Sequence, residues 1–91
     1  MQYFKRSNDF IMRNVGGESL LVPLGTRVVA VNGVIVLNGT ARCVWELLAQ
    51  ERSLDELAAA VAERFTVDVE HARIDVQRFL DEIGRMRALQ P

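Results

Sequence analysis

The segment "VIVLNGTARCVWELL", residues 34–48, decides the fold, because a β-like run in it passes directly into a helical pattern. Residues 34–37 are β-branched or apolar and predict a short strand. Asn38 has a side chain suited to capping the N-terminus of a helix. Four apolar residues then keep the i, i+3, i+4, i+7 spacing of one helical face: Ala41, Val44, Trp45 and Leu48.

Upstream of this segment the sequence predicts a hairpin. "FIMRNV" (10–15) and "ESLLVP" (18–23) have strand-like composition, and Gly16-Gly17 between them can adopt positive φ. Pro23 cannot donate to a strand ladder and is expected to end the second strand. Residues 27–31 join residues 34–37 through Asn32-Gly33, a strong hairpin signal. Residues 27–31 form either a separate strand or an extended approach.

Helical spacing continues to the end of the chain. A capping box, Ser53 to Glu56, opens a second helix, and Asp68 is the expected N-cap of a third. The apolar stripe of the second helix is Leu54, Leu57, Ala58, Val61 and Phe65, and that of the third is Ala72, Val76, Phe79, Leu80, Ile83 and Met86. Three strands followed by three helices predict an α+β fold, a winged helix-turn-helix with an antiparallel β-meander.

Length and composition predict one folded domain. The 91 residues are 49% hydrophobic and 25% charged, enough to bury one core. We expect this domain at residues 10–91, after a loose arm at residues 1–9 whose Tyr3 and Phe4 either pack on the body or meet a partner. One cysteine excludes an intrachain disulfide, and no apolar run is long enough to span a bilayer. We therefore expect a cytoplasmic protein.

Signs of catalysis are absent from the sequence. It contains no glycine-rich phosphate loop, no His-Glu-x-x-His motif and no nucleophile elbow. His71 is the single histidine and is expected at the solvated surface, since one imidazole without companions makes a poor metal site. Cys43 reads as a small buried residue, and Trp45 as a core anchor. We expect no enzyme activity, no metal and no cofactor.

The charge of the third helix bears on nucleic-acid binding, because a winged helix-turn-helix commonly presents such a helix to DNA. Its charges cancel, with four acidic and four basic residues: Glu70, Asp75, Asp81, Glu82, Arg73, Arg78, Arg85 and Arg87. The chain has a formal net charge of −1, which does not attract nucleic acid. A DNA-binding transcriptional regulator stays as the alternative function, and a small structural or regulatory subunit without a peptide ligand as the third.

Residues 10–89 resemble the PqqD family, which is named for pyrroloquinoline quinone (PQQ) biosynthesis. The shared features are, in order, Leu37-Asn38-x-Thr40-Ala41, Trp45-Glu46-Leu47-Leu48, Ser53-Leu54-x-Glu56-Leu57, Asp75-Val76 and Phe79-Leu80. "ESLLVPLG" is similar to members found beside peptide-modifying radical S-adenosylmethionine (SAM) enzymes. The chain departs from the family at Gly39, where an acidic residue is frequent, and in its ending, "RMRALQP".

The resemblance implies a peptide chaperone, also called a RiPP recognition element, where RiPP denotes a ribosomally made and modified peptide natural product. Members of the family bind the leader of a precursor peptide as an added strand beside the third strand and against the last helix. They present it to a modifying enzyme, which for this chain would be a radical SAM enzyme. The pathway would be PQQ biosynthesis or another peptide natural product, with neither nucleic acid nor membrane as partner.

The expected binding site follows from the same resemblance and from the physics of a strand edge, which offers unpaired N–H and C=O groups to an extended peptide. Arg78 would either bind an acidic leader residue through its guanidinium or pair with Asp75 or Asp81 on its own helix. The expected peptide-binding residues are Val34, Ile35, Val36 and Leu37 on the strand, and His71, Ile74, Asp75, Arg78 and Phe79 on the third helix, with Phe79 at the floor.

Overall fold

A computed structural model describes residues 2–24 and 35–91 of the chain. Strands β2 (Phe10–Val15), β3 (Glu18–Pro23) and β4 (Ile35–Leu37) form an antiparallel sheet in the order β2-β3-β4. The predicted hairpin, its end at Pro23 and the third strand are confirmed. Val34 and the segment 27–31 with its Asn32-Gly33 turn lie outside the described residues.

The turn between β2 and β3 determines how the backbone groups of the sheet alternate. Gly16 and Gly17 have φ of 58° and 84°, the positive values that a type I′ turn requires. Such a two-residue loop makes its flanking residues, Val15 and Glu18, a hydrogen-bonded pair. Along β2 and β3 from there, hydrogen-bonded and non-bonded pairs alternate, and this alternation decides which groups of β3 face β4.

Three helices are described after the sheet: α2 (Gly39–Leu47), α3 (Leu54–Phe65) and α4 (Val69–Arg85). Asn38 caps α2, because its Oδ1 accepts a hydrogen bond from the Ala41 N–H at 2.8 Å. The capping box of α3 is complete, with Ser53 and Glu56 each bonding the backbone N–H of the other. Asp68 precedes α4 as predicted but makes no side-chain cap bond.

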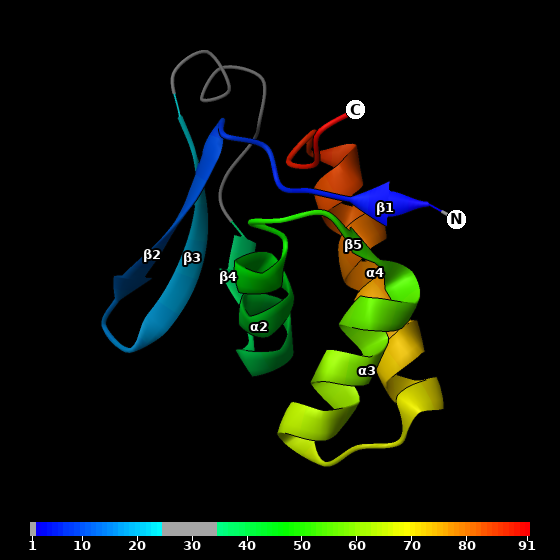
Figure 1. Cartoon of the computed structure of the whole chain (residues 1–91). Helices are drawn as coiled ribbons and strands as arrows, with labels where there is room; N and C mark the ends of the chain where they lie inside the picture. The colour runs from blue at the N-terminus through cyan, green and yellow to red at the C-terminus, as the bar shows by residue number, and fades with distance from the viewer. Residues whose placement is uncertain (1, 25–34) are drawn as a thin grey trace.

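The core lies where α2 is packed between the sheet and the α3–α4 pair (Figure 1). Trp45, Phe79 and Cys43 are buried as predicted, with exposed fractions of 1%, 8% and 4%. Strands and all three helices contribute to the cluster: Phe10, Leu21, Leu37, Ala41, Val44, Leu48, Leu57, Ala58, Val61, Ala72, Val76, Leu80, Ile83 and Ala88. Each helix therefore buries most of the stripe that its spacing indicated.

Three residues of the predicted stripes are less buried than expected, and one of them, Leu54, is half-buried at the start of α3. Phe65 is 37% exposed, because it is the last residue of α3 and the next residue, Thr66, turns out of the helix with φ of 53°. Met86 is half-buried for a similar reason, since it is the C-cap of α4. Helical spacing does not reveal where the packing partner of a helix ends, and all three residues stand at an end of their helix.

The segment before β2 differs from the predicted loose arm. Strand β1 (Tyr3–Phe4) pairs antiparallel with β5 (Arg52–Ser53), inside the connection between α2 and α3. The arm then reaches the C-terminal tail, where the Gln90 N–H donates to the Lys5 carbonyl at 2.8 Å (Figure 1). Phe4 packs on the core, whereas Tyr3 is 54% exposed. Residues 1–9 have no periodic pattern that would predict this pairing, because it depends on backbone groups of residues far along the chain.

Candidate functional site

Strand β4 is at the edge of the sheet, with β3 as its neighbour among the residues that the structure describes. Ile35, Val36 and Leu37 of β4 stand opposite Leu21, Leu20 and Ser19 of β3, respectively. An edge strand leaves half of its N–H and C=O groups without a partner in the sheet. The register with β3 decides which residue of β4 points these groups outward.

The alternation of bonded and non-bonded pairs that begins at the glycine turn determines the direction of the backbone groups of β4. Leu20 falls in a hydrogen-bonded pair with β2, so its backbone groups point away from β4. The same alternation predicts a hydrogen-bonded pair at Asp9 and Leu24, where the Leu24 N–H indeed donates to the Asp9 carbonyl at 2.7 Å. Opposite Leu20, Val36 is in a non-bonded pair with β3. The N–H and C=O of Val36 therefore face the open edge.

Side chains alternate along β4 in the same way. Leu37 is 5% exposed and belongs to the core face, and Ile35 on the same face packs against the core. Val36 points to the opposite face and is 57% exposed. On its outer face the open edge therefore has the exposed side chain of Val36. On its inner face it has Ile35 and Leu37, which pack toward the core.

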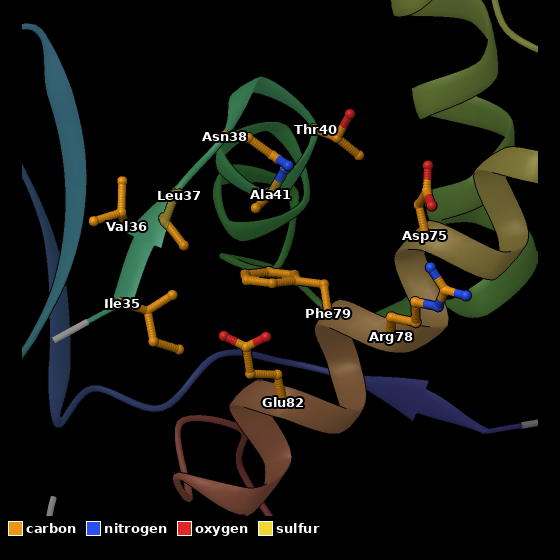
Figure 2. Close-up of a pocket in the computed structure, with 10 residues that line it drawn as sticks. All are labelled: Ile35, Val36, Leu37, Asn38, Thr40, Ala41, Asp75, Arg78, Phe79 and Glu82. Carbon is orange, nitrogen blue, oxygen red and sulfur yellow. The ribbon is translucent and has the colours of Figure 1, made fainter. Parts of the chain in front are cut away.

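A cleft of about 280 Å³ lies between β4 and α4 on this inner side (Figure 2). The ring of Phe79 projects from α4 toward Leu37 and Ala41 and forms the floor. Strand β4, the start of α2 and three charged side chains of α4 line the rest. The lining residues are Ile35, Val36, Leu37, Asn38, Thr40, Ala41, Asp75, Arg78, Phe79 and Glu82.

The structure brings most of the predicted site residues together. The three described strand residues line the cleft, as do Asp75, Arg78 and Phe79. His71 and Ile74 do not line it. They are exposed on α4, about one turn before Asp75 and Arg78 respectively, and so extend the same side of the helix toward its N-terminus. Val34 belongs to the residues that the structure does not describe.

The three charged groups of the cleft have no partners among the described side chains. Asp75, Arg78 and Glu82 make neither an ion pair within 4.0 Å nor a side-chain hydrogen bond in residues 2–24 and 35–91. Asp81, one of the partners considered for Arg78, instead accepts a hydrogen bond from Gln77 at 2.9 Å. The cleft therefore presents two carboxylates and one guanidinium that are available to a ligand.

Sequence reasoning missed four lining residues: Asn38, Thr40, Ala41 and Glu82. Asn38 and Ala41 were assigned to a helix cap and a core stripe, and they serve there as well as at the cleft. Glu82 could have been found, because it stands three residues after Phe79 and four after Arg78 and so shares their side of the helix. Thr40 was noted as part of the family motif and was not assigned to the site.

The groups considered for chemistry are dispersed. Cys43 is buried, and the His71 side chain is 82% exposed with Asp68 as its neighbour at 3.6 Å. In residues 2–24 and 35–91, histidine, cysteine and acidic side chains form no cluster of three that could hold a metal ion. The helices described there are also too short or too polar to cross a membrane. Among the described residues, the cleft between β4 and α4 is therefore the candidate site for a ligand.

A meander sheet, three helices and a cleft at the sheet edge define a small α+β domain of the winged helix-turn-helix class. The chain belongs to the PqqD family, whose model, described as coenzyme PQQ synthesis protein D, matches residues 18–87. A solved structure described as TbiB1 in complex with the TbiA(beta) leader peptide is similar in fold, with a TM-score of 0.72, 21% identity and 94% of each chain covered. No curated protein sequence matches the chain.

Proposed function

We propose that this protein is a non-catalytic adaptor that captures the leader of a ribosomally made precursor peptide and presents it to a modifying enzyme. The leader binds as an added strand on β4 and packs against α4. The modifying enzyme is a radical SAM enzyme, a partner suggested by the likeness of "ESLLVPLG" to family members that work beside such enzymes. Binding of this kind requires no cofactor and no reactive side chain.

The observation that carries this proposal is the outward-facing N–H and C=O of Val36 beside the cleft. An extended peptide is the ligand that satisfies both groups at once, since its own backbone offers the complementary donor and acceptor at the spacing of a strand. Two further observations support it: the chain is a PqqD family member, and the fold matches a protein whose structure was solved with a leader peptide.

The register determines how the leader would be read. A leader residue opposite Val36 points its side chain to the outer face, beside Val36 and Leu20. The residues before and after it point to the inner face, into the cleft above Phe79. The cleft of the adaptor thus contacts two leader side chains that are separated by one residue. A leader that continues along α4 also passes Ile74 and His71, which completes the proposed site.

An amide chemical-shift titration tests the proposal, with the leader of a candidate precursor peptide from the genomic neighbourhood as the probe. We expect shifts concentrated at residues 35–37 and 71–82. Shifts that fall only elsewhere would reject the site. No shifts at all, with a precursor that the neighbouring enzyme is shown to modify, would reject the function.

A further inference from the structure

One charged group that lines the cleft, the carboxylate of Glu82, was not part of the expected site. Figure 2 shows this carboxylate pointing from α4 into the space between Ile35 and the Phe79 ring. Arg78 directs its guanidinium away from β4, toward the side where Asp75 lies. The part of the cleft next to Ile35 therefore combines apolar side chains with one negative charge.

Glu82 has no partner within the described part of the protein. Its carboxylate makes no ion pair and no side-chain hydrogen bond in residues 2–24 and 35–91. Arg78 lies four residues earlier, but a basic residue N-terminal to an acidic one is the less favourable order for such a helical pair. A ligand that covers this end of the cleft would take water from the carboxylate and must supply a positive charge or hydrogen-bond donors in return.

We propose that Glu82 determines leader specificity by selecting a lysine or arginine side chain opposite Ile35. This inference rests on the proposed function and deepens it. Strand alternation sends the leader side chain at this position to the inner face, where Glu82 lies. The aliphatic stem of lysine or arginine packs against Ile35 and Phe79, and its charged end reaches the carboxylate. An acidic side chain there meets a like charge, which is strongly unfavourable at an interface.

The test uses the whole chain and a displayed library of random 12-residue peptides as the probe. Selection on the wild-type protein is compared with selection on Glu82→Lys. We expect the wild type to enrich lysine and arginine at one position of the bound peptides and Glu82→Lys to enrich aspartate and glutamate there. For a selected peptide, Glu82→Lys should weaken binding about tenfold, and exchanging the basic residue of the peptide for glutamate should restore it.

Asp81→Lys is the matched control, because it makes the same change of charge on the neighbouring residue, which is exposed and does not line the cleft. It should leave the selected sequences unchanged. Glu82 is exposed as well, so both variants should melt like the wild type. A change in the enriched residues that is equal for the two variants would mean long-range attraction rather than selection by Glu82, and would overturn the inference.

The outcomes separate this inference from the proposed function. Peptides that shift the Val36 amide but show no charge preference would reject the role of Glu82 and leave the adaptor function standing. Peptides that bind without shifting residues 35–37 would reject the site and the inference together. Failure of the library to yield any binding peptide would count against both.

Discussion

At the scale of single residues, Val36 controls the open edge through its backbone rather than its side chain. Proline at 36 removes the outward N–H but no hydrogen bond to β3, because Val36 is in a non-bonded pair with that strand. We expect Val36→Pro to weaken binding of the leader peptide about fivefold or more, the effect of losing one net hydrogen bond of about 1 kcal/mol. Isothermal titration calorimetry would measure this change.

Val36→Thr is the control for this prediction. Threonine keeps the N–H, the β-branched shape and the strand preference, so its effect on affinity should be well below that of proline. Circular dichroism should show both variants folded. Equal losses for the two variants would mean that the outer side chain, and not the backbone edge, carries the affinity.

Trp45 is the residue whose truncation should cost the most stability. It is 1% exposed, and Arg6 lies over its ring at 5.5 Å and donates to its carbonyl at 3.1 Å. Trp45→Ala should lower the free energy of unfolding by about 3–5 kcal/mol, measured by denaturant titration. An unchanged melting temperature of Trp45→Ala with lost peptide binding would contradict the core assignment.

Cys43→Ser, in the same helix, should preserve peptide binding if the fold survives.

At the scale of elements, the capping box of α3 joins a helix start to the β1–β5 pair. Ser53 caps the helix and also pairs with Tyr3, and it is 2% exposed. Ser53→Ala should lower the free energy of unfolding by about 1 kcal/mol, because it leaves the Glu56 N–H unsatisfied. Glu56→Gln retains a capping side chain and should cost less. A larger loss for Glu56→Gln than for Ser53→Ala would show that charge, not the cap geometry, stabilises this end.

At the scale of the whole molecule, the winged helix-turn-helix arrangement is combined with nearly balanced charge, from which we expect no tight binding of DNA. The chain has a formal net charge of −1, and α4 mixes acidic and basic residues along its exposed side. Fluorescence anisotropy with mixed-sequence duplex at roughly physiological salt should show affinity no tighter than about 10⁻⁶ M, the non-specific range. Tighter binding that falls steeply with added salt would favour the alternative of a transcriptional regulator.

The sequence predicts the candidate site only as far as local spacing shows the element and the face on which a residue lies. Ile35, Leu37 and Phe79 were expected at the site from the family resemblance and the strand-edge argument, and local pattern placed them on a strand and on an apolar helical stripe. Val36 was expected at the site, but the direction of its N–H depends on a register that starts at Gly16-Gly17, two strands away. Glu82 was overlooked, although its spacing of three residues from Phe79 and four from Arg78 places it on their side of α4.

The sequence by itself determined the α+β class, the hairpin at residues 10–23 and the buried stripes of the helices, because periodicity and caps act between near neighbours along the chain. The tertiary structure alone decided that β4 is an edge of the described sheet, that α4 faces it across a cleft, and that the N-terminal arm pairs with β5. These contacts join residues tens of positions apart. They depend on how whole elements pack, and no local spacing encodes that.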